Sequence, residues 1–332
     1  MHNRPSVLVT GAAGFIGSHV ADRCLKLGFN VVATDDLSGG CLQNVPKQAH
    51  WMRGDLRDSR FVESLFVGPQ YAYIYHLAAY AAEGLSHFIR RFNYQTNLVA
   101  SANLINEAVK NQVRCFIFTS SIAVYGSNQT PLTEEMEPRP EDPYGISKYA
   151  VELDLRAAHE MFGLDFIVFR PHNVYGERQN IADPYRNVIG IFMNQLLRHE
   201  PMTIFGDGLQ TRAFTHIDDI ASIIAQAPLV PDAVNQVFNI GADTPCTILQ
   251  LAGEVAAAFG CERNVKHLPA RNEAVHAFSN HAKTRRVFNP PAALDLKTGI
   301  GRMADWVKSR GAAPPVSFSE IEVTKNLPPS WL

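Results

Sequence analysis

A tyrosine and a lysine stand four residues apart, as Tyr144 and Lys148 within the stretch 143–148 (PYGISK). On a helix, residues i and i+4 share one face, so the phenol and the ammonium group would be neighbours. The charge of Lys148 would then favour the phenolate and lower the Tyr144 pKa from its ordinary value of about 10. The pair is therefore a candidate proton acceptor near neutral pH, although an ordinary surface helix can show the same spacing.

Three glycines near the start of the chain could hold a phosphate-bearing cofactor. Gly11, Gly14 and Gly17 follow the β-branched apolar run 6–10 and precede a helical pattern. Such a turn lets the backbone approach a pyrophosphate at a helix N-terminus. A tight turn between a strand and a helix, without a ligand, is the alternative.

Acidic residues follow the next two apolar runs. Asp35 ends the run 30–34, where a dinucleotide-binding fold places the acid that binds the adenosine ribose. Asp36 follows it, and no arginine is adjacent to hold a 2′-phosphate, which favours NAD over NADP. Asp55 and Leu56 either border the adenine or form only a loop.

The totals exclude several classes of protein. The 332 residues are 46% hydrophobic and 19% charged, with a formal net charge of -2, so a surface for nucleic acid is not expected. No apolar stretch reaches the roughly 18 residues of a membrane span, and no signal peptide precedes the first strand. The five cysteines are scattered, without metal-ligand or CxxC spacing, which predicts neither a metal site nor disulfides. A cytoplasmic location follows as the expectation.

Strand-like and helix-like runs alternate through the first half of the chain. This alternation predicts an α/β fold with a Rossmann-like, doubly wound parallel sheet. The second half is less regular and predicts a smaller mixed α/β lobe that binds the substrate. We expect residues 1–170, with about 213–245, to bind NAD, and residues 171–212 and 246–332 to form the lobe. The expected strands are 6–10, 30–34, 51–56, 72–79, 114–119, 165–170 and 237–240, and the expected helices include 97–110, 147–161, 187–198, 218–225 and 247–259.

Several short motifs resemble those of one known family. They are 11–17 (GAAGFIG), 76–79 (HLAA), Asn97, Ser120–Ser121, 124–126 (VYG), 144–148 (YGISK), 170–176 (RPHNVYG) and 239–241 (NIG). Together they resemble the extended short-chain dehydrogenase/reductases over roughly positions 6 to 310. Within that family, the chain is most similar to NAD-dependent nucleotide-sugar epimerases of the UDP-glucose 4-epimerase type.

The resemblance implies a catalytic trio of Ser121, Tyr144 and Lys148. Tyr144 would take the proton from the sugar 4-hydroxyl, Ser121 would hydrogen-bond the same oxygen, and Lys148 would bind the nicotinamide ribose. NAD would stay bound and shuttle a hydride, with a transient 4-keto sugar between its two transfers. The implied cofactor contacts are Gly11, Gly14, Phe15, Ile16, Gly17, Asp35, Asp36, Asp55, Leu56, Leu77, Ala78, Ala79, Asn97, Tyr144 and Lys148.

The resemblance also implies contacts to a UDP-sugar and a homodimer. Ser121 and Asn173 would lie near the substrate, Arg178 would meet a sugar carboxylate if there is one, and Arg212 and Arg271 would bind the diphosphate. Surface salt bridges are the alternative for Arg212 and Arg271, and relatives with neutral sugars also carry an arginine at the position of Arg178. A small Ala277 in the pocket wall would admit a 2-acetamido group. Helices 97–110 and 147–161 have family counterparts that pair across a two-fold axis; otherwise they cover the sheet.

Three other functions stay open from the sequence. Related 4,6-dehydratases use acidic residues where this chain has Ile122 and Ala123, which cannot perform acid–base chemistry. Glu83 could instead face the sugar and support elimination, or be a plain loop carboxylate. A 4-keto reductase on the same fold is a further alternative. A dinucleotide-binding sensor without turnover is disfavoured because both Tyr144 and Lys148 are present.

Overall fold

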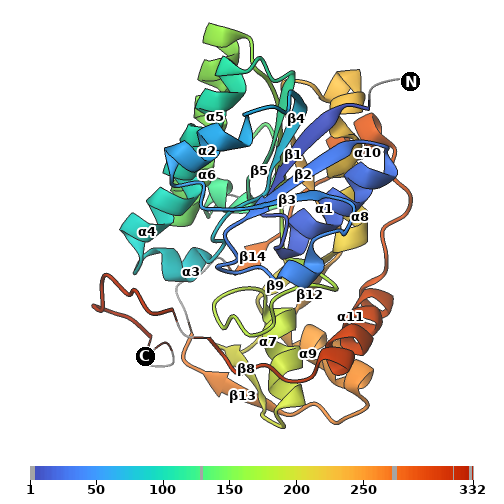
Figure 1. The fold of residues 1–332 in the computed structure, drawn as a ribbon. Helices are drawn as coiled ribbons and strands as arrows, with labels where there is room; N and C mark the ends of the chain where they lie inside the picture. The colour runs from blue at the N-terminus through green and yellow to red at the C-terminus, as the bar shows by residue number, and fades with distance from the viewer. Residues whose placement is uncertain (1–3, 128–129, 271–274, 317, 329–330, 332) are drawn as a thin grey trace.

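A parallel sheet of seven strands forms the centre of the computed structural model, which describes residues 4–127, 130–270, 275–316, 318–328 and 331. This confirms the expected α/β fold with a Rossmann-like sheet (Figure 1). The order reverses between β1 and β4, where such sheets open a crevice at the carboxyl ends of their strands. From one edge to the other the strands are β11 (Gln236–Ile240), β6 (Asp165–Pro171), β5 (Cys115–Thr119), β4 (Tyr71–His76), β1 (Ser6–Thr10), β2 (Asn30–Asp35) and β3 (His50–Arg53).

Helices cover both faces of the sheet, which explains why its strands are continuous apolar runs. On β1, Val7 and Val9 pack toward one face and Leu8 toward the other, and all three are fully buried. The first face is covered by α1 (Phe15–Lys26), α8 (Ile217–Gln226) and α10 (Ala282–Phe288), and the second by α2 (Ser59–Leu65), α5 (Ala100–Lys110) and α6 (Pro143–Phe162).

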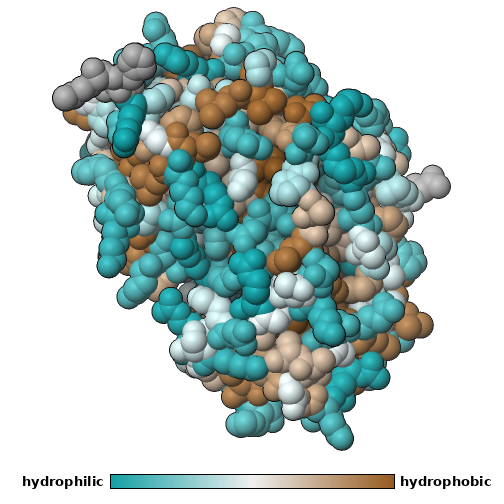
Figure 2. Space-filling view, turned by 90° about the vertical axis from the view of Figure 1, so that its right-hand side faces the viewer, coloured by the Kyte–Doolittle hydropathy of each residue, from teal (hydrophilic) through white to brown (hydrophobic). Residues whose placement is uncertain are grey.

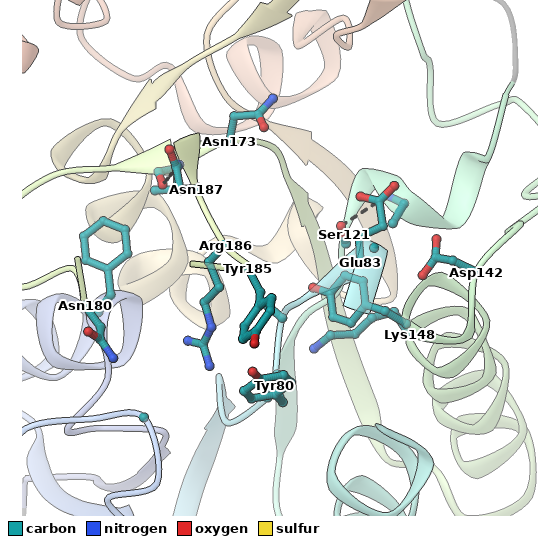
Figure 3. A pocket seen from close by; sticks show the side chains of 18 of the residues that line it. Tyr80, Glu83, Ser121, Asp142, Lys148, Asn173, Asn180, Tyr185, Arg186 and Asn187 are labelled. Carbon is teal, nitrogen blue, oxygen red and sulfur yellow. Dashed lines mark hydrogen bonds between the residues drawn. The ribbon is translucent and has the colours of Figure 1, made fainter. Parts of the chain in front are cut away.

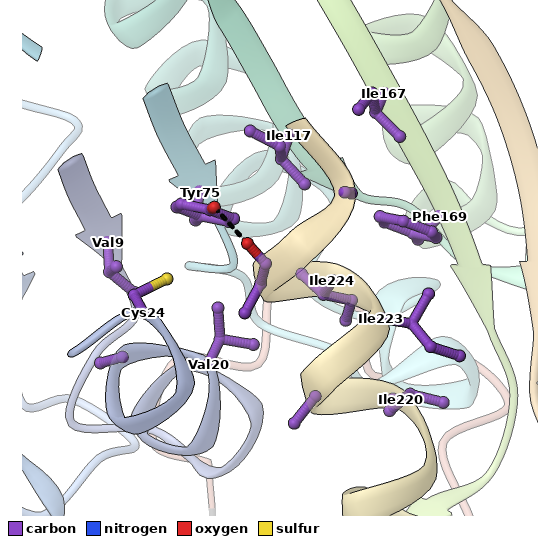
Figure 4. Close-up of a cluster of buried hydrophobic side chains, with 14 of the residues drawn as sticks. Val9, Val20, Cys24, Tyr75, Ile117, Ile167, Phe169, Ile220, Ile223 and Ile224 are labelled. Carbon is purple, nitrogen blue, oxygen red and sulfur yellow. Dashed lines mark hydrogen bonds between the residues drawn. The ribbon is translucent and has the colours of Figure 1, made fainter. Parts of the chain in front are cut away.

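A buried tyrosine ties the first helical layer to the sheet. The Tyr75 hydroxyl on β4 donates a 2.6 Å hydrogen bond to the Ala225 carbonyl oxygen on α8 (Figure 4). Around it, Val20 and Cys24 of α1 and Ile224 of α8 are fully buried. Because this layer is dry and closely packed, it fixes the end of β1 from which the glycine turn leaves.

A smaller lobe lies below the sheet (Figure 1) and has its own apolar core. That core lies between three helices and is covered by short strands. The helices are α7 (Val188–Leu197), α9 (Ile248–Phe259) and α11 (Leu296–Arg310); the strands are β8 (Met202–Phe205) with β13 (Val265–Leu268), β9 (Thr211–Ala213) between β12 (Pro245–Thr247) and β14 (His276–Ala277), and β7 (Val174–Tyr175) with β10 (Thr215–His216).

The chain does not end at α11. Its C-terminal segment, which we define as residues 311–316, 318–328 and 331, returns toward the sheet and lies beside α3 (Glu83–Ser86) and α4 (Arg90–Tyr94) in Figure 1. The side of the molecule in Figure 2 is covered mainly by hydrophilic side chains, with apolar ones in scattered patches. Among the described residues, none of the helices combines the length and apolarity needed to cross a bilayer.

The largest difference from the expected elements concerns the helix predicted over 97–110. The helical run starts at Arg90 with α4, passes through a π-helical stretch at Gln95–Val99, and becomes regular α-helix only at Ala100. A π-helical stretch adds a residue to the turn and shifts the apolar face. The buried stripe therefore contains Leu104 and Ala108 beside the predicted Ile105, whereas the predicted Leu98, Ala102 and Val109 are only partly buried. The sequence pattern also gave no sign of α2, α10 or α11.

Candidate functional site

One large cavity opens at the carboxyl ends of the parallel strands, between the sheet and the smaller lobe. Its volume is about 1680 Å³, and residues from both regions line it. A pocket for a single small molecule usually measures about 300–1,000 Å³. The cavity therefore has room for two ligands side by side, such as a dinucleotide and a second nucleotide.

The glycine turn lies on the sheet side of this cavity. Gly11 has a left-handed φ of +67°, and the turn closes with a 3.0 Å hydrogen bond from the Gly14 N–H to the Gly11 carbonyl. A Cβ on Gly17 would stand 2.0 Å from that same oxygen, so only glycine fits. No side chain caps the N-terminus of α1, which leaves its first N–H groups available to an anion. The turn therefore fits the pyrophosphate of NAD.

The acids predicted to bind adenosine line the same end of the cavity. Asp35 accepts hydrogen bonds from the Ala13 N–H at 3.1 Å and the Leu37 N–H at 2.7 Å, which hold its carboxylate at the end of β2. Burial raises the pKa of Asp35. Asp36, Asp55 and Leu56 also line this end. Asp55 is bound by the Arg57 side chain, a cavity arginine that the sequence pattern had not suggested.

The loop after β4 is held by a polar network beneath it. The Thr10 hydroxyl oxygen accepts hydrogen bonds from the Leu77 and Ala78 N–H groups and also contacts the His76 Nδ1 at 2.8 Å. Leu77, Ala78 and Ala79 all line the cavity, as do Phe15 and Ile16. Asn97 does not line it. Its buried amide instead pairs with the backbone N–H and carbonyl of Tyr80, so it positions this loop from behind.

Ser121, Tyr144 and Lys148 lie together in the cavity, at the ends of β5 and α6. The helix begins four residues before the predicted Ser147, because Pro143 occupies its first turn and the Asp142 carboxylate caps it through the Gly145 N–H at 2.9 Å. Tyr144 and Lys148 thus share one helical face. Ser121 is in turn fixed as the cap of the short 3₁₀ helix at Ile122–Tyr125.

The electrostatics of the pair differ from the expectation that Lys148 lowers the Tyr144 pKa. The Lys148 ammonium donates a 2.8 Å hydrogen bond to the Thr119 carbonyl and lies 5.9 Å from the centre of the Tyr144 ring. Burial dominates and raises the Tyr144 pKa well above its ordinary value, and the hydrogen bond with Ser121 opposes this shift. Burial also lowers the pKa of Lys148 to about 7. In the protein alone, burial therefore outweighs any lowering of the Tyr144 pKa by Lys148.

A buried ion pair lies behind the lysine. Arg170 of β6 and Glu152 of α6 are joined by two hydrogen bonds, and Glu152 also accepts a 2.6 Å hydrogen bond from the Ser120 hydroxyl. Both side chains are almost completely buried. The negative charge of Glu152 raises the pKa of Lys148 against the effect of burial. The pair therefore fixes α6 on the sheet and helps to keep Lys148 charged.

The residues predicted to bind the substrate fall into three groups. Asn173, Arg212 and Ala277 line the lobe side of the cavity, with Ala277 directly beside Arg212 on paired strands. Arg178 does not reach the cavity: its guanidinium forms a 2.7 Å ion pair with Asp22 of α1, so it joins the lobe to the sheet layer. Arg271 lies outside the described residues.

Sequence reasoning missed several residues of the cavity wall. Figure 3 shows Tyr80, Tyr185 and Arg186 grouped beside Lys148 and Ser121. The Arg186 guanidinium lies over the Tyr80 ring, 4.8 Å from its centre, and pairs with Asp183 at 2.8 Å. These residues lie on loops, where no periodic pattern exists to show which side chains point inward.

Glu83 was flagged from the sequence and does line the cavity. It begins α3, and its charge is near enough to contribute to the raised Tyr144 pKa. It is therefore close to the reacting end of the site. In the described part of the chain, no three His, Cys, Asp or Glu side chains converge as a metal site.

Comparisons with known proteins agree with this geometry. The NAD dependent epimerase/dehydratase family model matches residues 7–241. The UDP-glucose 4-epimerase of Mycolicibacterium smegmatis is 31% identical over 91% of this chain and 98% of its own. The crystal structure of UDP-glucose 4-epimerase with UDP-glucose from Thermotoga maritima superposes with a TM-score of 0.86 at 31% identity, over 92% of this chain and 99% of that one.

A further solved structure widens the range of sugars among the relatives. The UDP-N-acetylglucosamine 4-epimerase of Methanobrevibacter ruminantium, in complex with UDP-N-acetylmuramic acid, has a TM-score of 0.86 at 30% identity, over 93% of this chain and 100% of that one. The family model spans most of the cavity-lining sheet, and the structures extend the likeness through the smaller lobe. The chain belongs to the NAD-dependent epimerase/dehydratase family.

Proposed function

We propose that the protein is an NAD-dependent 4-epimerase of a UDP-hexose. The observation that supports this most is the convergence of Ser121, Tyr144 and Lys148 with the glycine turn on one cavity large enough for two nucleotides. We further propose that residues 1–170 with about 213–245 bind NAD, and that 171–212 and 246–332 bind the sugar nucleotide.

In this proposal, the protein's own groups bind, orient and move protons. Tyr144 accepts the proton of the sugar 4-hydroxyl and later returns it, while the Ser121 hydroxyl hydrogen-bonds the same oxygen. Lys148, anchored on the Thr119 carbonyl, has further N–H groups to donate to ribose hydroxyls of the cofactor. When bound, NAD supplies the hydride acceptor and a positive charge to the pocket. A positive charge beside Tyr144 would offset the burial that raises the Tyr144 pKa in the protein alone.

The dinucleotide is held by the glycine turn, Asp35 and Asp36. Its adenine end lies at Asp55 and Leu56. Arg212 binds the diphosphate of the substrate. Arg271 stays a proposed second phosphate contact. The acid pair at the end of β2 favours NAD over NADP. Asn97 acts indirectly, through the loop at Leu77–Ala79.

A 4,6-dehydratase is the second candidate, because Glu83 lines the cavity near Tyr144. Its weakness is that Ile122 and Ala123 occupy the positions where related dehydratases carry acids. A 4-keto reductase would use the same cavity but would consume reduced cofactor.

The test is incubation with UDP-glucose, UDP-N-acetylglucosamine and UDP-glucuronate, each without added cofactor, followed by separation of the products. We expect the 4-epimer of at least one sugar, together with NAD that copurifies with the protein. A 4-keto-6-deoxy product would establish the dehydratase instead, and a need for added NADH would establish the reductase. No conversion of any sugar, with the cofactor bound, would contradict the enzymatic proposal.

We also propose a homodimer that is formed through α5 and α6. Leu153, Met161 and Phe162 on α6 are 45%, 74% and 66% exposed, which is unusual for large apolar side chains on one helix. Sedimentation of the protein should give twice the chain mass, and Leu153→Glu should give monomers.

All five cysteines are free thiols, as a reducing compartment would keep them.

A further inference from the structure

The C-terminal segment closes one side of the cavity. Three of its residues, Val323, Lys325 and Asn326, form part of the cavity wall. Figure 1 shows the segment passing beside α3 and α4 on its way to the end of the chain. A wall that is built from the end of a chain opens when the segment detaches. The attachments of the segment therefore decide how easily a ligand on this side can leave.

Hydrogen bonds attach the segment to both regions that enclose the cavity. On the lobe side, the Phe318 N–H donates to the Tyr185 hydroxyl at 3.2 Å. On the sheet side, the Glu322 carboxylate accepts hydrogen bonds from the Arg91 and Phe92 N–H groups at 2.8 and 2.9 Å. The short stretch from Phe318 to Glu322 therefore joins the lobe to the sheet side across the cavity.

An aromatic cluster packs the segment onto the sheet side. The Phe318 ring meets the rings of Phe92 and Tyr80 at centroid distances of 4.9 and 5.4 Å, and those two rings meet each other edge-on at 5.4 Å. Such pairs contribute beyond the area that they bury. Phe92 and Tyr80 line the cavity, whereas Phe318 lies outside its lining in the described part of the chain. Phe318 therefore holds the wall in place from behind.

The cluster lies on the part of the cavity that we assign to the cofactor. Tyr80 directly follows the loop after β4, which carries three of the proposed cofactor contacts. The Arg57 guanidinium lies over the Phe92 ring, 5.7 Å from its centre, and binds Asp55 at the proposed adenine end. Hydrogen bonds to Asp55 raise the pKa of Arg57 most, and the charge of Glu320 on the segment adds to that rise. The segment therefore borders the proposed cofactor site from this loop to the adenine end.

We propose that the C-terminal segment is a clasp that retains the cofactor: its attachments through Phe318 and Glu322 must break before NAD can pass this wall in either direction. This inference rests on the proposed function and adds a reason why the cofactor would stay bound between turnovers. A clasp of this kind slows entry and exit together, because one opening serves both. The dissociation constant, which is the ratio of the two rates, then changes little when the clasp is weakened.

The test measures how fast bound NAD exchanges with excess isotopically labelled NAD in the full-length protein, which needs neither sugar nor turnover. We expect Phe318→Ala to raise the exchange rate about tenfold, because it removes both ring contacts of the segment. Glu322→Gln keeps one acceptor oxygen but places an amide donor against the second N–H group, so it should raise the rate severalfold. Phe318→Leu keeps most of the apolar volume and should give a rate between those of the parent and Phe318→Ala.

Equilibrium binding separates a clasp from a direct contact to the cofactor. Titration of cofactor-free protein with NAD should give a Kd for Phe318→Ala within about threefold of the parent value. A rise in Kd as large as the rise in exchange rate would show a lost contact to NAD and would overturn the inference. Ser319→Ala, an exposed position on the same segment outside the cavity wall, is the control and should change neither quantity.

An exchange rate that stays unchanged in both Phe318→Ala and Glu322→Gln would also overturn the inference, and it would leave the proposed epimerisation untouched. If Phe318→Ala fails to fold, Tyr185→Phe serves instead, since it removes only the oxygen that accepts the Phe318 N–H, and it should also speed exchange. Faster exchange in variants of a protein that converts no sugar would contradict the proposed function and leave the inference standing.

Discussion

The parallel sheet presents its cavity residues at the ends of strands of four to seven residues, whereas the smaller lobe presents them on strands of two to four residues and on loops. Gly11, Asp35 and Ser121 follow or end strands that are buried on both faces, and Tyr144 sits in the first turn of a capped helix. By contrast, Arg212 lies on a strand of only three residues, and the loops carry Asn173 and Arg186. The rigid part suits proton and hydride transfer, which tolerates little misplacement. The irregular part suits the choice of substrate, which varies among the relatives.

The largest expected effect is on chemistry and belongs to the sheet side. Tyr144→Phe removes the proposed proton acceptor, so kcat should fall by about 10²–10⁴ while the amount of NAD that we expect to copurify stays the same. Tyr149→Phe, on the next turn of α6 but outside the cavity wall, is the matched control. Product separation and cofactor content measure both effects. Turnover that survives in Tyr144→Phe would show that Tyr144, on the sheet side, is not the proton acceptor.

The second effect is on stability of the sheet side. Glu152→Gln leaves the buried Arg170 cation without its counter-charge, so the free energy of unfolding should fall by about 3–5 kcal/mol. Glu137→Gln breaks an exposed pair with Arg139 and should cost at most about 1 kcal/mol. Urea denaturation of both variants provides the comparison. Equal losses would show that the buried pair does not anchor α6.

The third effect belongs to the lobe and should change affinity alone. Arg212→Ala removes the proposed charged contact to the substrate diphosphate, so KM should rise about ten- to hundredfold with kcat and NAD content little changed. Steady-state measurements of KM and kcat for Arg212→Ala test this prediction. A loss of kcat with an unaltered KM would place Arg212 with the reacting groups instead.

A fourth effect is a pH dependence of stability that arises from Lys148. Its pKa is about 7 in the folded protein and about 10.5 when unfolded, because burial penalises the charged form. Between these values the unfolded chain binds more protons, so this group makes stability rise with pH from about 7 to about 10.5. Cofactor-free Lys148→Met should lack that rise when thermal melts of the two proteins are compared across this range. Parallel curves would mean that the ammonium is not penalised by burial.

The same contrast between the two regions governs how much the sequence could reveal. The strand at Ser6–Thr10, the glycine turn and the cap-and-helix pattern around Tyr144 are local signals, set by burial on both faces and by backbone geometry. The positions of Asp35 and Ser121 follow from them, because parallel strands end at one edge. Strands as short as β9 and β14 have no usable period, so the inward direction of Arg212 came from the resemblance alone.

Three features of the structure could not be predicted from local patterns in the sequence. Arg178 follows a motif that suggests a ligand contact, but its left-handed backbone turns the side chain toward Asp22. The pKa of Lys148 depends on burial, which lowers it, and on the charge of Glu152, which raises it, and the spacing of Tyr144 and Lys148 reveals neither effect. The C-terminal segment binds α4 and Tyr185 across more than 130 residues of sequence, a pairing that periodicity does not encode.

The central claim, that Tyr144 and bound NAD invert one sugar carbon by transient oxidation, is tested most directly with UDP-hexose deuterated at C4. The product mixture of a substrate that turns over should be analysed by NMR after incubation without added cofactor. We predict that deuterium stays at C4 in both epimers, because the same hydrogen leaves and returns within one site. Deuterium found at C6 of a 4-keto-6-deoxy product would contradict it and establish elimination instead.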